Sequence, residues 1–161
     1  TKVVQPTKIE LIIESKEAKI NRKMEKYDKE KKEIIFDPTG ETIKMLDVAP
    51  FIASGRTLVP LRFIGEEFGA NIEWDQKERK VTYILGREKI ELWVGRKDAI
   101  ITIENIKKAI KLDVEPRVIP PGRTVVPLRF VAEALTADVK WDASTRKITV
   151  ILPSKGDELP Q

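Results

Sequence analysis

The side chains that most often carry catalysis are absent from this sequence, since its 161 residues include no histidine and no cysteine. Without histidine, the chain lacks the usual general base near neutral pH and the commonest imidazole ligand for transition metals. Without cysteine, it can form no disulfide, no zinc–thiolate site and no thiolate nucleophile. We therefore expect no cofactor, no bound metal and no enzymatic activity.

Carboxylates are the remaining candidates for catalysis, because two of them can act as acid and base on a glycosidic bond. The spacing of the acids points no two of them at one bond, and no Walker, GxGxxG, EF-hand or HExxH pattern occurs. A glycoside or peptide hydrolase is kept only as a third hypothesis. The acids in question are Glu66, Glu67, Glu133, Asp75 and Asp142.

Tryptophan beside aspartate is a candidate sugar site, because an indole stacks on a sugar ring and a carboxylate accepts hydrogen bonds from its hydroxyls. The pair occurs twice, as Trp74-Asp75 and Trp141-Asp142. The alternation of each expected hairpin favours a core position for the tryptophan and a turn-starting role for the aspartate. We therefore predict Trp74 and Trp141 to be structural core residues rather than a ligand platform.

Trp93 differs from the other two tryptophans because strand alternation places it on the face opposite Ile90 and Leu92. We expect it to be the exposed tryptophan. Its partner is either a carbohydrate or the other half of the chain, and the sequence leaves both open.

Four arginines recur at equivalent positions, and arginine suits bidentate contact with carboxylate or phosphate. Two of them, Arg62 and Arg129, stand four residues before Glu66 and Glu133. Internal bracing is the favoured interpretation and anion binding the alternative. Arg62 and Arg129 join Trp93 as the candidate ligand-binding residues; the other two arginines are Arg56 and Arg123.

These residues belong to a repeated segment: residues 55–85 recur without a gap, 67 positions later, as residues 122–152. Each copy reads as a short strand, a helix opened by Pro60 or Pro127, and a hairpin. An apolar stripe along each helix predicts its buried face. The predicted core comprises Leu61, Phe68, Leu128 and Leu135 together with the two hairpin tryptophans.

The repeat begins earlier than this segment, since KIEL occurs at Lys8 and again at Lys89. Aligning both matches requires a 15-residue charged insertion in the first copy, between about residues 21 and 41. A short exposed helix and a charged hairpin both fit it. Gly86-Arg87 suits a hairpin turn, so the copies should be rigidly joined, with a shared sheet as one option.

We therefore predict an α+β fold of two tandem repeats, each an antiparallel β-sheet packed against one short α-helix. Residues 1–7 are expected to be a leader and 153–161 a tail with linker composition. The first repeat would span residues 8–86 and the second 87–152.

Charge argues against nucleic acid as a partner, because the net charge of +4 arises from interspersed signs rather than a basic block. No run approaches the ~18 apolar residues of a membrane span. Charged residues reach 35% of the chain, which suggests an ion-paired surface and a thermophilic source.

The motif G-R-T-x-V-P-L-R-F, followed by a helix, a Trp-Asp pair and a hairpin, resembles the copper amine oxidase N-terminal domain family, also called stalk domains. The resemblance covers Lys8 to Leu152 and departs at the insertion and at Thr136, where the family favours glycine. It implies a sheet covered by helix in exported bacterial proteins, beside wall-anchoring, peptidase or glycan-active domains. It implies no oxidase, because amine oxidases hold copper through histidines in a separate domain.

Our leading hypothesis is a non-catalytic extracellular module, a rigid spacer or interaction domain at a bacterial cell surface. Its expected partner is another cell-surface protein or a cell-wall or plant polysaccharide. The alternative is a carbohydrate-binding module of an exported polysaccharide-active protein. The sequence predicts a secreted or cell-surface location only through the family resemblance, and it predicts no oligomeric state.

Overall fold

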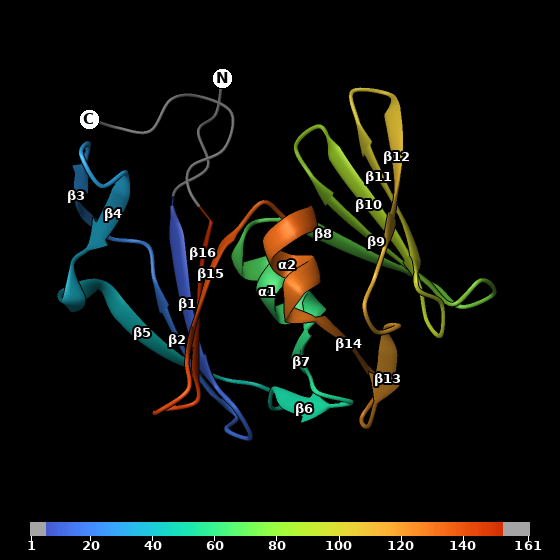
Figure 1. The fold of residues 1–161 in the computed structure, drawn as a ribbon, viewed down its shortest axis with the longest axis horizontal. Coiled ribbons are helices and arrows are strands. Elements are labelled where there is room, and N and C mark those ends of the chain that lie inside the picture. The colour runs from blue at the N-terminus through green and yellow to red at the C-terminus, as the bar shows by residue number, and fades with distance from the viewer. Residues whose placement is uncertain (1–5, 153–161) are drawn as a thin grey trace.

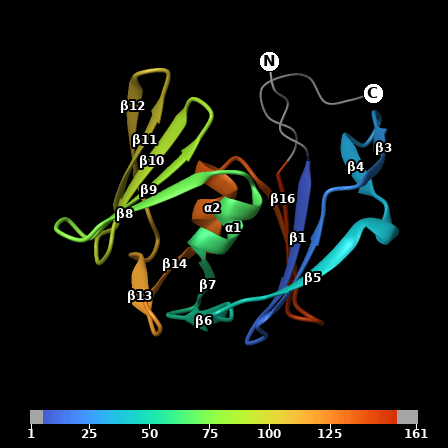
Figure 2. The same ribbon diagram turned by 180° about the vertical axis from the view of Figure 1, so that it is seen from behind.

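Two five-stranded antiparallel sheets stand on either side of a pair of short helices in the computed structural model, which describes residues 6–152 (Figure 1). The reverse view shows the same arrangement, with a smaller four-stranded sheet at one end of the helix pair (Figure 2). The predicted α+β class, antiparallel sheet with two short helices, is confirmed. Neither helix is long and apolar enough to cross a bilayer.

The first large sheet joins the two ends of the described chain. Its inner strand β1 carries KIEL and pairs on one side with the last strand, β16, and on the other with β2. Its order is β15 (Asp138–Asp142), β16 (Lys147–Leu152), β1 (Thr7–Ile12), β2 (Glu17–Asn21) and β5 (Glu41–Met45).

The second large sheet is built from the middle of the chain with the same pattern of neighbours. Here the second KIEL strand, β10, pairs with β9 and β11. Its order is β8 (Asn71–Asp75), β9 (Lys80–Leu85), β10 (Glu88–Trp93), β11 (Asp98–Ile103) and β12 (Ile106–Lys111).

The registers of the two large sheets agree. Ile9 pairs with Val150 and Ile20, while Ile90, its counterpart 81 positions later, pairs with Tyr83 and Ile101. Since register is fixed by which face of each strand is buried, the repeated apolar pattern accounts for the matched pairing.

The sequence repeats nevertheless do not build one sheet each, so that part of the prediction is wrong. The turn at Gly86-Arg87 makes β9 and β10 a hairpin, as expected, and this hairpin places the end of one repeat beside the start of the next. Strand β1 pairs with β2 of its own repeat on one side and with β16 of the final hairpin on the other. Both large sheets are therefore shared between the repeats.

A smaller sheet and the two helices lie between the large sheets. Strands β7 and β14, one from each repeat, pair at its centre, and each runs directly into a helix. Proline ends each of these strands and supplies the extended residue before the helix. The elements are β6 (Phe51–Ala53), β7 (Arg56–Pro60), β13 (Arg117–Ile119), β14 (Arg123–Pro127), α1 (Leu61–Glu67) and α2 (Leu128–Ala134).

The main core fills the space between both large sheets and the helices. Leu61 and Leu135 are fully buried and Phe68 is 1% exposed, as predicted, while Leu128 is half-buried against the core. A smaller apolar cluster lies on the small sheet, around Leu58 and Val125.

The prediction that both hairpin tryptophans belong to the core is wrong, because Trp74 is 38% and Trp141 46% exposed. They lie on β8 and β15, which are edge strands of the two large sheets and have a neighbouring strand on one side only. Alternation alone gave the correct strand face. It could not show that the helix, only seven residues long, leaves the far end of each edge strand open.

The insertion forms a charged hairpin, β3 (Met24–Asp28) with β4 (Glu33–Phe36), so the helical alternative is wrong. A 3₁₀ turn at Pro38–Gly40 follows, where Asp37 accepts a hydrogen bond from the Thr39 amide. Asn21, 2% exposed, donates to the Asp37 carbonyl at 2.7 Å and ties the hairpin to β2.

The ends of the repeat deviate in smaller ways. Of the predicted leader, Thr7 already belongs to β1 and is buried, while residues 1–5 lie outside the described residues, as does the predicted tail. Thr136 adopts φ 56°, close to the left-handed geometry of Gly69 in the first repeat. Thr136 therefore accepts backbone strain that glycine would avoid.

Glu67 anchors the insertion to the core. Its carboxylate accepts hydrogen bonds from Arg22 at 2.6 Å and Lys44 at 2.5 Å, and its side chain is only 10% exposed. Burial raises the pKa of Glu67, but the hydrogen bonds from Lys44 and Arg22 outweigh burial and leave the pKa below its usual value.

We expect Glu67→Gln to lower the free energy of unfolding at neutral pH by about 1 kcal/mol, since solvent screens both half-exposed cations. A lowered carboxylate pKa stabilises the fold above the ordinary value of 4.5, and this contribution disappears as pH falls through the folded pKa. The difference between wild type and Glu67→Gln should therefore shrink below that pH in urea unfolding. Glu66→Gln is the control, because Glu66 is exposed and 3.7 Å from Arg62, and it should cost under about 0.5 kcal/mol. A penalty that persists in acid would contradict this assignment.

Candidate functional site

The candidate site that contains a partly exposed tryptophan, which we call the tryptophan pocket, is a cavity of about 460 Å³ between three elements. The start of α1 forms one wall, the β8–β9 hairpin a second, and the β13–β14 hairpin of the other repeat a third. Apolar side chains line part of it, namely Leu61, Ile72, Val81 and Val118.

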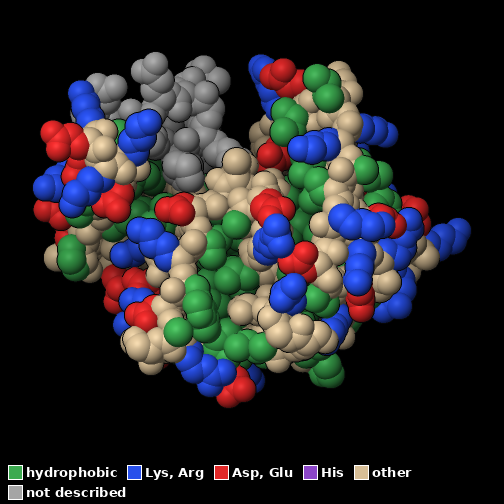
Figure 3. Space-filling view, in the orientation of Figure 1, with side chains coloured by type: hydrophobic (Ala, Val, Ile, Leu, Met, Phe, Trp, Pro, Cys, Tyr) green, Lys and Arg blue, Asp and Glu red, His purple; other side chains and the backbone are tan. Residues whose placement is uncertain are grey.

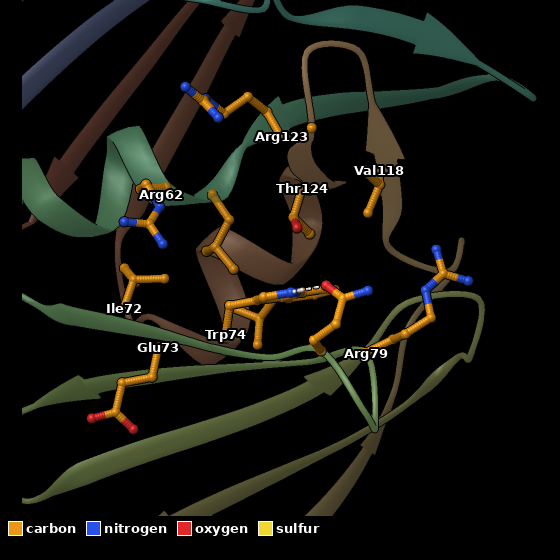
Figure 4. A pocket seen from close by; sticks show the side chains of 12 residues that line it. Arg62, Ile72, Glu73, Trp74, Arg79, Val118, Arg123 and Thr124 are labelled. Carbon is orange, nitrogen blue, oxygen red and sulfur yellow. Dashed lines mark hydrogen bonds between the residues drawn. The ribbon is translucent and has the colours of Figure 1, made fainter.

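Trp74 lines the pocket with its ring held in place. Its indole N–H donates to the Gln76 side-chain oxygen at 2.8 Å. Val118 and Thr124 face the ring across the cavity (Figure 4). A fixed, partly exposed indole opposite an apolar group and a hydroxyl is suited to hold a flat, amphipathic ring.

Three arginines line the pocket: Arg62, Arg79 and Arg123 (Figure 4). Arg123 is fixed by Asp47, to which its Nε donates at 2.8 Å. Arg62 has only a loose pair with Glu66, at 3.7 Å. Among the described residues, no carboxylate lies within ion-pairing distance of Arg79. Two of the three cations are thus available to a ligand.

A second cavity of about 580 Å³, which we call the counterpart cavity, occupies the corresponding place on α2. It is lined by Arg56 and Arg129, the equivalents of Arg123 and Arg62. Asp113 lies between them, 3.4 Å from Arg56 and 3.3 Å from Arg129, and Glu133 accepts from Arg129 at 2.6 Å. The hydrogen bond with Glu133 and the charge of Asp113 raise the pKa of Arg129. The arginines of this cavity are already neutralised.

The residues proposed from the sequence as a ligand site do not come together. Arg62 lies in the tryptophan pocket and Arg129 in the counterpart cavity, while Trp93 lines neither of them. Trp93, expected to be the exposed tryptophan, is half-buried, with the Arg96 guanidinium 5.0 Å from its ring centre. The exposure order of the three tryptophans is therefore the reverse of the prediction.

Sequence reasoning missed Gln76, Arg79 and the β13–β14 wall of the pocket. Gln76 and Arg79 fall in the turn after Trp74, where polar residues are ordinary. The available signal was a comparison between copies, because Gln76 is replaced by Ala143 in the second repeat. No sequence signal places Val118 and Thr124 opposite Trp74, since they belong to the other repeat.

The acids considered for catalysis have other partners. Asp75 accepts from the amide of Lys77 at 2.9 Å, and Asp142 accepts from Ser144 at 3.0 Å, so both start turns as expected. The Ser144 hydroxyl also bonds Asp142 and lowers the pKa of that carboxyl. Within residues 6–152, no group of three or more acidic side chains could hold a metal ion.

The described residues thus define a small α+β domain that offers a pocket and no recognised catalytic group. The chain belongs to the copper amine oxidase N-terminal domain family, whose model matches residues 38–150, more than half of the sequence. The N-terminal domain of this family is a non-catalytic domain. Searches of curated proteins and of solved structures found no significant similarity.

Proposed function

We propose that this chain is a non-catalytic extracellular module that binds a polysaccharide through the tryptophan pocket. One observation carries the proposal: Trp74, 38% exposed, lines a cavity of about 460 Å³ among side chains that form hydrogen bonds. A single exposed indole on a protein surface does not by itself indicate a binding site. Trp74, in contrast, is held by Gln76 and lines a cavity that three arginines also line, which is the arrangement of a binding site.

The chemistry of a sugar ring fits this surface. Its apolar C–H face stacks on an indole, and its hydroxyls bond arginine, glutamine and threonine side chains at the ring edge. The pocket supplies all three around Trp74, in Arg62, Gln76 and Thr124. A cell-wall or plant polysaccharide is the proposed partner, at the surface of a thermophilic bacterium or in its medium.

The interspersed charges of the surface support this setting without specifying it. Figure 3 shows lysine and arginine side chains mixed with aspartate and glutamate over the visible face. Glu10 on β1, for example, lies 3.1 Å from Lys147 on the neighbouring strand β16 and 3.5 Å from Lys8. Networks of this kind contribute more to stability at high temperature than at 25 °C.

Trp74→Ala tests the proposal, with Trp141→Ala as its matched control. Trp74 lines a pocket and is held by Gln76, whereas Trp141 is exposed on the equivalent strand and does not line the counterpart cavity. Calorimetry with soluble xylan, polygalacturonate and peptidoglycan fragments should detect binding by wild type. We expect Trp74→Ala to lose at least about tenfold in affinity, or about 1.4 kcal/mol, and Trp141→Ala to lose less than about twofold. Wild-type affinity in a folded Trp74→Ala protein would refute the assignment.

A rigid spacer is the second candidate function, favoured by the sharing of strands between the repeats. Both large sheets, and the β7–β14 pair between them, contain strands from each repeat. Bending the chain between the repeats would break these ladders. If no polysaccharide binds, a single cooperative unfolding transition and a small-angle scattering profile of one rigid body would support a spacer. The expected partner is then another cell-surface protein.

A further inference from the structure

We infer that the tryptophan pocket takes an anionic saccharide, a sugar ring that carries a carboxylate or a phosphate, and that the counterpart cavity does not. This inference rests on the proposed function, since it names the ligand class of the same site. It adds the requirement that the sugar carry a negative charge, which stacking on the indole alone does not impose.

The charge of the pocket is the first observation. Three arginines line it, and the acid that also borders it, Glu73, points away from the others (Figure 4). Strand alternation explains this direction, because Ile72 and Trp74 occupy one face of β8 and Glu73 the opposite face. The interior of the pocket is therefore cationic.

The pairing state of these arginines is the second observation. Arg79 has no carboxylate within ion-pairing distance among the described residues, whereas its equivalent Arg146 lies 3.9 Å from Glu14. Arg62 is 3.7 Å from one carboxylate, whereas its equivalent Arg129 contacts two. Arg62 and Arg79 are thus less paired with carboxylates than their equivalents in the second repeat, of which Arg129 lines the counterpart cavity.

An arginine that is not tightly paired with a carboxylate and lies beside an aromatic ring favours an anionic ligand. A guanidinium is weakly hydrated and presents paired N–H donors that match the oxygens of carboxylate or phosphate. A neutral sugar would gain hydrogen bonds from Arg62 and Arg79 but no compensation of their charge. An acidic sugar gains both, and its ring remains free to stack on Trp74.

The experiment measures affinity by calorimetry at low and at higher salt for three probes. Trigalacturonic acid supplies carboxylates, its methyl ester supplies the same rings without charge, and a glycosylated wall teichoic acid supplies phosphate. Arg62→Gln and Arg79→Gln remove one cation each from the pocket. Arg129→Gln and Arg146→Gln are the matched controls on the second repeat. Thermal unfolding confirms that each variant is folded.

We expect wild type to bind trigalacturonate or the teichoic acid at least about tenfold more tightly than the methyl ester, with affinity falling as salt rises. The preferred acid identifies carboxylate or phosphate as the source of the charge. Each pocket variant should lose about tenfold for the charged probe, and each control less than twofold.

Two different failures are distinguishable. If wild type binds the ester and the acids equally, and Trp74→Ala abolishes both, sugar binding stands and the anionic inference is overturned. If none of the probes binds, and neutral xylan does not bind either, the proposed function falls and this inference falls with it. Equal losses in Arg62→Gln and Arg129→Gln would overturn the asserted difference between the two cavities.

Discussion

Removal of the last hairpin, residues 138–152, should abolish cooperative unfolding of the whole chain, including the strands at the opposite end of the sequence. β16 pairs with β1 along six positions, from Thr7 opposite Leu152 to Ile12 opposite Lys147. Three side chains of β16 are fully buried in the main core: Ile148, Val150 and Leu152. A chain ending at residue 137 should give no sigmoidal thermal transition by circular dichroism and should be cleaved rapidly by protease.

The physical reason is the exchange of strands between repeats. Without the last hairpin, β1, β2 and β5 keep only one another, and the apolar face of that three-stranded sheet loses part of its cover. Each large side chain removed from the core costs about 2–5 kcal/mol of unfolding free energy. The loss of three therefore exceeds the lower end of the roughly 5–15 kcal/mol by which a typical domain is stable.

A second deletion of similar length is the control. Residues 23–39 lie within the connection from β2 to β5, which spans residues 22–40, whereas the equivalent strands β11 and β12 are joined by Glu104-Asn105 alone. Both of those turn residues have positive φ, as a tight hairpin requires. Replacing residues 23–39 by Glu-Asn should preserve a cooperative transition and cost at most about 2 kcal/mol. If the chain ending at residue 137 unfolds like wild type, the shared sheets are not what stabilises the molecule.

Several features of the fold follow from local sequence patterns and were predictable. Pro60 and Pro127 precede the two helices because proline and its extended neighbour suit that boundary. The hairpin at Gly86-Arg87 follows from a two-residue break between alternating strands, with Gly86 at positive φ. The sharing of a sheet was then a consequence of chain connectivity.

The candidate site was less predictable because it is assembled from both repeats. Trp74 comes from β8, while Thr124 and Val118 come from the β13–β14 hairpin, more than 40 positions later in the sequence. Alternation along β8 predicts which face Trp74 occupies. It carries no information about whether another element covers that face. The exposure of Trp74 and the partial burial of Trp93 both depend on such distant packing.

Gly65→Ala is expected to destabilise the protein, although alanine in a helix is normally about 1 kcal/mol better than glycine. Gly65 lies in α1, where an added Cβ would stand 2.8 Å from Ile72 Cδ1 and 3.2 Å from the Tyr83 ring. Tyr83 is fully buried, so its ring has little room to move. Overpacking of this kind costs about 1–3 kcal/mol, and we expect a net loss of about that size in urea unfolding.

The second repeat shows how the conflict is relieved and supplies the test. It has Ala132 at the position of Gly65 and Val150 at that of Tyr83, so the smaller strand residue accompanies the larger helix residue. Gly65→Ala should become neutral or stabilising in a Tyr83→Val background. Tyr83→Val also removes a buried hydroxyl that has no hydrogen-bond partner among the described residues. The double-mutant cycle should therefore give a favourable coupling of about 2 kcal/mol between the two substitutions. An equal cost for Gly65→Ala in both backgrounds would show that Tyr83 is not what requires glycine there.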